Sequence, residues 1–395
     1  MKNLKESVKF IISILNENFR RKIETVNLNE ALGRILAGEI SAKRNSPVFS
    51  NSALDGYAFC DDYKGQVLEI LNDTIFAGDK KIREIKEAKA IKIMTGAPMP
   101  KGANCVIRLE DAVIKNGKIS VPCNTKKNDG NREMGEEFFK NERMLVRGTK
   151  ISPKEILFLA SQGIYEIPVF CEHKTGIFSS GNELIEPNEE AGDFEIYNAN
   201  SYGISAIFNY FGIKNSYLGI IKDDKSATKN ALQNALEVHD IIITSGGASV
   251  GEADFVALCI KDLGFESILE GVNFKPGGKP LKCFKKDQKI VFVLPGNPLA
   301  SFILSFLFVI PIIKFLNGET FKFFRQKAKF QGNFKNKKNR ASLLLGMFEN
   351  GIFTPFENIS SYMISPLLKS NAILICECEN IKNNDECEVI RLFDK

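Results

Sequence analysis

Acidic and glycine residues gather directly after one strongly apolar run, Asp240-Ile-Ile-Ile. The segment that follows reads Thr244-Ser-Gly-Gly-Ala-Ser-Val-Gly-Glu-Ala-Asp254. Its glycines let the backbone approach phosphate oxygens, whereas its two acids would repel a bare phosphate unless a divalent cation lay between them. The segment therefore predicts a phosphate and metal site at the carboxyl end of a buried parallel strand. The candidate ligands here are Ser245, Gly246, Gly247, Ser249, Gly251 and Asp254.

Two further segments combine an apolar run with a polar, glycine-bearing turn. Lys174-Thr-Gly-Ile-Phe-Ser-Ser-Gly-Asn-Glu-Leu184 offers Ser180, Gly181 and Glu183. Ile290-Val-Phe-Val-Leu-Pro-Gly-Asn-Pro298 offers Pro295, Gly296 and Asn297. A single turn of this kind is more often a plain connection, but three on one side of a sheet favour a binding site.

The elements that must position these turns alternate along the chain. Apolar residues have helical spacing from Ser201 to Phe211 and from Ser226 to Leu236, between the three apolar runs. Residues 172 to 318 are therefore expected to form a doubly wound α/β sheet. A helix is also expected after Ser152, which suits the N-cap position, with Pro153 in the first turn. Lys115-Asn-Gly-Lys118 and Asn350-Gly351 predict hairpin turns.

Two further motifs precede the three turns, namely Asn51-Ser-Ala-Leu-Asp-Gly-Tyr57 and Ile93-Met-Thr-Gly-Ala-Pro98. From about residue 28 to the C-terminus, the chain resembles the molybdopterin molybdenumtransferase (MoeA) family, whose N-S-A-M-D-G-Y motif is similar to the first and whose I-M-T-G-A-P motif matches the second. The motifs S-S-G-[DN]-E-L, S-G-G-x-S-x-G-x-x-D and L-P-G-N-P follow in the expected order. Five motifs in register are far more specific than a lone glycine pattern.

The resemblance implies an α/β multidomain protein with four parts. Residues 1–46 and 139–171 would form an elongated N-terminal domain used for dimerisation, and residues 47–138 an inserted, mainly β domain. Residues 172–318 would be the α/β molybdopterin-binding domain, and residues 319–395 a small C-terminal β domain.

The resemblance also implies a reaction, in which molybdate is ligated to adenylated molybdopterin with Mg²⁺ as cofactor and AMP is released. It assigns catalytic roles to Asp55, Thr95, Glu183 and Asp254, and metal binding to Asp223, Glu183 and Asp254. Helix capping is the structural alternative for Asp223, and capping of a helix or turn for Glu183. Asp55 and Thr95 rest on the resemblance alone, which implies a homodimer whose inserted domain reaches the partner's cleft. Transient partners would be the adenylyltransferase or apo-molybdoenzymes.

For the molybdate oxyanion, the candidates are Lys275, Lys279 and Ser301, and here the chain departs from the family pattern. A second glycine is inserted in Phe274-Lys-Pro-Gly-Gly-Lys-Pro280. Ala300 and Leu345 stand where the family usually has a hydroxyl residue and an arginine, and Glu137 replaces an aspartate. Two alternatives to an insertase remain open. One is a molybdopterin adenylyltransferase or nucleotide pyrophosphatase, and the other is a pterin-binding scaffold with weakened turnover.

Composition is that of an ordinary globular protein, with 395 residues, 44% hydrophobic and 26% charged. The two histidines, His173 and His239, make a zinc site improbable, and the nine cysteines include no C-x-x-C pair. The apolar run Leu299 to Ile313 contains Pro311 and is expected to be a buried helix rather than a membrane span. The expected compartment is the reducing cytoplasm, where thiols stay free. Basic and aromatic residues alternate between Phe321 and Arg340, for which a core-facing strand is favoured over nucleic-acid binding.

Overall fold

The computed structural model describes residues 3–247, 255–337 and 340–393. These residues form two compact units. The first contains Met1–Thr25, Gly33–Ala37 and Pro168–Lys395, and the second contains Val26–Leu32 and Gly38–Ile167. Strand β1 (Ile23–Asn27) pairs with β12 (Glu166–Phe170), and the boundary between the units falls within both strands. The finer division into four domains stays a prediction.

The centre of the first unit is a six-stranded sheet in the order β16-β13-β17-β21-β20-β18. The strands β16 (Asn215–Ile221), β13 (Thr175–Ser180), β17 (Ile241–Ser245) and β21 (Lys289–Leu294) are parallel. The strands β20 (Lys282–Lys286) and β18 (Glu266–Glu270) extend the sheet as antiparallel neighbours. The predicted α/β class and its parallel strands are confirmed.

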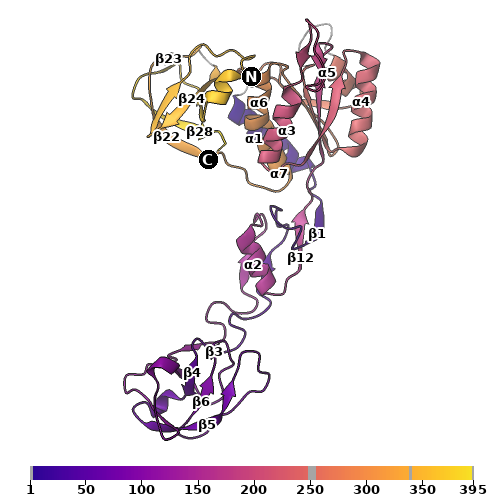
Figure 1. The fold of residues 1–395 in the computed structure, drawn as a ribbon. Coiled ribbons are helices and arrows are strands. Elements are labelled where there is room, and N and C mark those ends of the chain that lie inside the picture. The colour runs from indigo at the N-terminus through magenta and orange to yellow at the C-terminus, as the bar shows by residue number, and fades with distance from the viewer. Residues whose placement is uncertain (1–2, 248–254, 338–339, 394–395) are drawn as a thin grey trace. The chain divides into compact units, whose positions relative to one another are not determined.

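Helices cover both faces of this sheet (Figure 1). Ile241 and Ile243 share a core with α3 (Asn200–Tyr210), α6 (Pro298–Leu304) and α7 (Ile310–Leu316). Ile242 points to the opposite face, into a core with α4 (Lys225–Val238) and α5 (Phe255–Asp262). All three isoleucines are fully buried, as expected for a strand covered on both sides. The sheet is therefore doubly wound.

The N-terminal helix α1 (Leu4–Asn18) begins with a capping box between Asn3 and Glu6. Its apolar side buries Leu4, Ile11 and Leu15 in the same core as α7, which lies about 300 residues later in the sequence. Helix α1 is therefore packed with the α/β sheet in the first unit.

The apolar run after Pro298 is continuously helical to Leu316, with a π turn at Ser305–Val309 directly before α7. Pro311 lacks a backbone N–H, and the wider π turn lies where the hydrogen-bond ladder must adjust to this residue. By length and composition these 19 residues could cross a membrane, but 89% of the most apolar window is buried within the protein. Burial of this kind is typical of a core helix.

The carboxyl-terminal strands close into a small barrel. The pairing runs β24 (Ala341–Glu349), β25 (Ile352–Pro355), β22 (Arg325–Phe330), β28 (Glu386–Arg391) and β26 (Ala372–Cys376), and β26 returns to β24. The short strand β19 (Phe274–Lys275) adds to β24 as a parallel neighbour. Asn350 and Gly351, both with positive φ, form the expected hairpin turn between β24 and β25. A second pair, β23 (Phe334–Lys335) and β27 (Asn380–Ile381), and helix α8 (Ser365–Lys369) complete this region.

In the basic and aromatic run between Phe321 and Arg340, most of the aromatic side chains pack inward and the basic side chains of β22 point outward. Phe330 is fully buried, and Phe321, Phe323 and Phe334 pack against the core. On β22, Lys327 lies opposite Glu388, and Lys329 lies opposite Glu386. Arg325 also forms an ion pair with Glu388 at 2.7 Å. Acids on the neighbouring strand thus balance much of the basic charge of β22, which supports the core-facing interpretation.

The second unit is mainly β. Its largest sheet has the order β7-β4-β6-β5-β9-β8. These strands are β7 (Cys105–Arg108), β4 (Gly56–Phe59), β6 (Lys89–Ile93), β5 (Val67–Ile75), β9 (Lys118–Ser120) and β8 (Val113–Lys115). The predicted hairpin is confirmed, because Lys115 pairs with Lys118. Two small ladders join β3 (Asn51–Ser52) to β10 (Asn131–Arg132) and β2 (Ile40–Ser41) to β11 (Arg143–Leu145). Helix α2 (Pro153–Ser161) has the predicted N-cap, Ser152, within a capping box.

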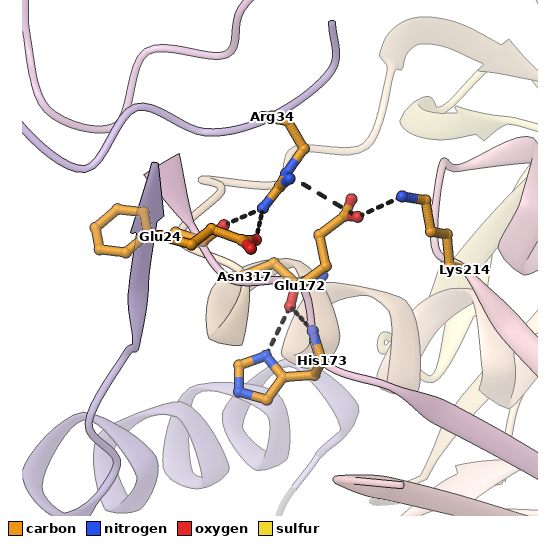
Figure 2. A network of polar contacts seen from close by, with 7 residues as sticks. Glu24, Arg34, Glu172, His173, Lys214 and Asn317 are labelled. Carbon is orange, nitrogen blue, oxygen red and sulfur yellow. Dashed lines mark hydrogen bonds and ion pairs between the residues drawn. The ribbon is translucent and has the colours of Figure 1, made fainter. Parts of the chain in front are cut away.

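A polar network in the first unit ties together the segments through which the chain leaves and re-enters it (Figure 2). Arg34 donates to Glu24 and to the carbonyl of Phe170, and it faces Glu172, which Lys214 approaches to 3.0 Å. The neighbouring His173 contacts the side chain of Asn317 through its backbone N–H at 3.1 Å and through Nδ1 at 2.7 Å. Burial lowers the pKa of His173, so this histidine is a neutral structural residue.

Candidate functional site

A pocket of about 920 Å³ opens at the carboxyl ends of the parallel strands of the first unit. Residues from the ends of β13, β17 and β21, and from the turn after β16, lie side by side in its lining. Ten of the predicted residues meet here, namely Ser180, Gly181, Glu183, Asp223, Ser245, Gly246, Gly247, Pro295, Gly296 and Asn297. The structure therefore brings the three separate turns together in the lining of one pocket.

Gly246 shows why the turn after β17 needs a glycine. Its φ is +95°, and a Cβ at this position would lie 2.3 Å from the carbonyl oxygen of Ser180 on the neighbouring strand. The backbone can approach Ser180 only because this side chain is missing. Glycine at this position therefore allows the turn after β17 to pack against the end of β13, where both border the pocket.

The two acids in the pocket are positioned by the segment after β13. Asn182 and Asp223 bond reciprocally, because the Asn182 N–H donates to Asp223 Oδ2 at 3.3 Å and the Asp223 N–H donates to Asn182 Oδ1 at 3.0 Å. Glu183 is exposed and folds its carboxylate over Gly181. The helix-cap alternative for Asp223 is wrong, since the N-cap of α4 is Asp224, whose side chain accepts from the Ala227 N–H at 2.7 Å. Asp223 is thus free of that structural role.

Hydroxyl and amide groups form a buried support behind the pocket. Ser245 Oγ lies 3.0 Å from Ser301 Oγ and receives a hydrogen bond from Asn200 Nδ2 at 2.8 Å. Asn200 also donates to the carbonyl of Gly296 at 2.7 Å. Ser301 itself is fully buried and is not in the lining. It therefore orients Ser245 from behind.

Replacing Ser301 with Ala should remove one hydrogen bond from Ser245 and leave the fold intact. We expect a loss of roughly 1 kcal/mol in the free energy of unfolding, measured by urea denaturation, because one buried hydrogen bond contributes about that much. Ser305→Ala is the matched control, since its hydroxyl donates to the carbonyl of Ser301 and not to a pocket residue. If only Ser301→Ala weakens pterin binding, Ser301 supports the site. Equal binding by both variants would contradict this role.

Sequence reasoning missed several residues of the lining, chiefly those just before α3. Asn198 is buried, accepts from Ser179 Oγ at 2.6 Å and donates to the Tyr217 hydroxyl at 2.8 Å. Tyr217 in turn donates to Glu186 and has a raised pKa, first because of burial and then because of this bond. The only signal was Asn198-Ala-Asn200 at the start of a helical pattern, which does not distinguish a binding residue from a cap. Other unpredicted lining residues are Leu184, Ile196, Tyr197, Ala199, Asn200, Pro280, Pro298 and Tyr362.

Asp55 and Thr95 meet in the second unit, although 40 residues separate them in the chain. Asp55 Oδ1 accepts from the Thr95 N–H at 2.6 Å and from Thr95 Oγ1 at 2.7 Å. The bond from the Thr95 N–H is the main reason that the pKa of Asp55 lies below its usual range, so Asp55 is an ionised acid on an exposed surface. Of the remaining predicted residues, Ser249, Gly251 and Asp254 lie outside the described residues.

Comparisons with known proteins agree with this arrangement. Residues 3–163 match the model of the MoeA N-terminal region (domain I and II), and residues 176–314 match a probable molybdopterin binding domain. The chain is 31% identical to the molybdopterin molybdenumtransferase of Haemophilus influenzae over 373 residues, which cover 91% of each protein. The chain belongs to the MoeA family.

Other MoeA-like proteins extend the comparison over nearly the whole chain. A putative molybdopterin biosynthesis protein of Methanocaldococcus jannaschii is 30% identical over 99% of this chain and 97% of its own length. A molybdopterin biosynthesis MoeA protein of Pyrococcus horikoshii OT3, known from its crystal structure, is 28% identical and superimposes with a TM-score of 0.81, covering 99% of this chain and 100% of that one. This MoeA family member is a transferase of molybdenum cofactor biosynthesis.

The departures from the MoeA pattern have structural explanations. A Cβ added to Gly277 would lie 2.6 Å from the Cβ of Ala300, so the loop with the extra glycine packs directly against the residue that lacks a hydroxyl. The two departures therefore occur in contact. Leu345 is fully buried in the main core, and Glu137 accepts a hydrogen bond from Ser46 Oγ at 2.5 Å.

The lysine loop lies at the margin of the site. Lys275 and Lys279 are both exposed, and neither is in the pocket lining, which the loop reaches only at Pro280. The described lining contains two acids and neither a lysine nor an arginine. The pocket as described thus presents acids, polar groups and the amino-terminal turns of α3 and α6 to a ligand.

Proposed function

We propose that this protein is a molybdenum insertase, which ligates molybdate to adenylated molybdopterin and releases AMP. The observation that carries the proposal is the pocket itself, where bare glycine main chain and two carboxylates share one lining at the ends of parallel strands. Main-chain groups and helix amino termini suit the phosphates of a nucleotide. Membership of the MoeA family supports molybdopterin as the other half of that substrate.

The donor set fits Mg²⁺. Glu183 and Asp223 provide carboxylate oxygens in the pocket, and Mg²⁺ in nucleotide sites is commonly bound through one or two carboxylates together with substrate phosphates. A bound Mg²⁺ would neutralise phosphate charge and polarise the phosphoanhydride. The lining supports this assignment, because an anionic substrate would otherwise meet two acids without any described lysine or arginine beside them.

The residues of the chain then have separate tasks. Gly246 lets the turn after β17 pack against Ser180, while Ser301 and Asn200 hold the hydroxyl of Ser245 in place beside the pocket. Asn182 keeps Asp223 in place through two hydrogen bonds. Lys275 and Lys279 are proposed to recruit molybdate at the exposed margin, since ammonium groups attract oxyanions without needing to be buried.

One assay tests the proposal directly. The purified protein is incubated with adenylated molybdopterin and Mg²⁺, with and without molybdate, and the release of AMP is measured. We expect release that depends on molybdate and restores activity to an apo-molybdoenzyme. Release that is equally fast without molybdate would instead indicate a pyrophosphatase, and adenylation of molybdopterin from ATP would indicate an adenylyltransferase. Pterin binding without turnover would leave the scaffold alternative.

A homodimer with shared clefts is part of the proposal. Its support is the family resemblance together with Asp55, an exposed and ionised acid in the second unit that accepts hydrogen bonds from Thr95. We expect mixtures of Asp55→Ala and Asp223→Asn subunits to regain roughly a quarter of wild-type turnover, because half of the randomly mixed dimers would each contain one intact cleft. Each variant alone serves as the control. If labelled subunits demonstrably exchange and turnover stays at the level of the single variants, the shared cleft is wrong.

The proposed compartment is the cytoplasm. All nine cysteines are free thiols in the structure, which is the usual state in a reducing compartment.

A further inference from the structure

Two cysteines lie in contact at the end of strand β26, far along the chain from every residue assigned to the proposed reaction. Cys376 ends β26 and is 3% exposed, whereas Cys378, two residues later, is exposed. Their Sγ atoms are 3.5 Å apart, and Cys376 Sγ also lies 3.5 Å from the carbonyl oxygen of Cys378. Cys378 lies in the bend that follows β26, and this bend returns its thiol to the thiol of Cys376.

The backbone around the two thiols is clamped by one buried side chain. Asn336 Nδ2 donates to the carbonyl of Cys376 at 3.0 Å, and the Asn336 N–H donates to the carbonyl of Glu379 at 2.8 Å. Asn336 is itself 8% exposed and accepts from Ser342 Oγ at 2.7 Å. Asn336 thus holds the backbone at Cys376 and at the residue after Cys378, which constrains the turn that carries both sulfurs.

We propose that Cys376 and Cys378 form a reversible thiol–disulfide site that low-molecular-weight disulfides oxidise. Bond formation requires the sulfurs to approach from 3.5 Å to about 2.05 Å, which side-chain rotation of the exposed Cys378 can supply. A metal centre is the less suitable use of these thiols. Cys387 packs in the same cluster as Cys376, but the three cysteines are not among the groups of described residues whose ligand atoms lie close enough to hold one ion.

The exchange balances with the small disulfide as oxidant. The thiolate of Cys378, the accessible group, attacks one sulfur of the small disulfide and releases the first small thiolate. The sulfur of Cys376 then attacks Sγ of Cys378, releases the second small thiolate and completes the Cys376–Cys378 bond. The two protons lost by the cysteines are taken up by the two released thiolates. Burial raises the pKa of Cys376 to about 12, so the second step should be slower and should accelerate as the pH rises.

The test uses the full-length protein and oxidised glutathione. After exposure, free thiols are alkylated and the peptide containing residues 376–378 is identified by mass spectrometry. We expect this peptide to lose both reactive thiols without carrying glutathione, and to regain both after reduction. In Cys376→Ala, Cys378 should instead retain a glutathione adduct, because the second thiol is missing. In Cys387→Ser the internal disulfide should still form.

Three outcomes would overturn the proposal. They are a persistent glutathione adduct on Cys378 of the wild-type protein, an internal bond between Cys376 and Cys387, and no reaction at Cys378 under conditions that modify the exposed Cys123. The Cys378→Ser variant guards against a folding artefact, because this exposed position tolerates a hydroxyl and should simply leave Cys376 reduced. The result is independent of the proposed insertase activity.

Discussion

Replacing Glu183 with Gln should lower turnover by roughly 100-fold, the usual effect of removing one group that stabilises developing charge. Gln keeps the shape of the side chain but removes the charge that is proposed to help hold Mg²⁺ over the bare main chain of the pocket. The concentration of Mg²⁺ needed for half-maximal AMP release should rise at the same time. The measurement is a Mg²⁺ titration of molybdate-dependent AMP release.

Glu190→Gln is the matched control for this experiment. Glu190 is an exposed acid in the same segment between β13 and α3, and it is not in the pocket lining. The Glu190→Gln substitution removes an equal charge from the same segment. It therefore controls for a general change in the electrostatic attraction of Mg²⁺ to the protein. Identical Mg²⁺ titrations for the two variants would remove Glu183 from the site.

Gly246→Ala should lower the free energy of unfolding strongly, because the added methyl group has no space in this turn. The new Cβ would lie 2.3 Å from the carbonyl oxygen of Ser180, and the residue would keep a φ of +95° that side chains rarely adopt. We expect the free energy of unfolding to fall by roughly 2–5 kcal/mol, the sum of backbone strain and overpacking. Urea denaturation followed by circular dichroism measures it, and pterin binding should be lost in the folded fraction.

Gly219→Ala separates these two costs. Gly219 has a similar φ of +102°, but an added Cβ there would have no atom within 4 Å. It should therefore show the strain alone, roughly 1–2 kcal/mol. If Gly246→Ala is no more destabilising than Gly219→Ala, the close approach to Ser180 does not constrain this turn.

The sequence predicted those parts of the fold that depend on short, local patterns. Three consecutive isoleucines, Ile241 to Ile243, indicated a strand buried on both faces, and the structure confirms it. The hairpins at Asn116-Gly117 and Asn350-Gly351 followed from the need for positive φ at both turn residues. Glycine turns at the ends of parallel strands also predicted about half of the described pocket lining, since such ends always meet at one edge of a sheet.

Features set by tertiary packing could not be predicted. Asn198 and Asn200 line the pocket because α3 begins beside β17 and β21, and no local pattern distinguishes them from ordinary caps. Tyr362 is among the lining residues, and the adjacent Ser361 binds Asn297 and Leu299 although more than 60 residues separate them in sequence. Likewise, the contact between the Gly277-Gly278 loop and Ala300 is visible only once Gly277 is placed against that side chain.

The packing of helix α1 against α7 has a consequence during synthesis on the ribosome. Leu4, Ile11 and Leu15 are made about 300 residues before Ile310–Leu316, which is part of the core that covers them. At ~5–20 residues per second, the apolar side of α1 waits on the order of tens of seconds for its partner. Nascent chains that end before residue 298 would therefore lack the helix against which α1 packs, and part of the apolar side of α1 would stay exposed until α7 is made.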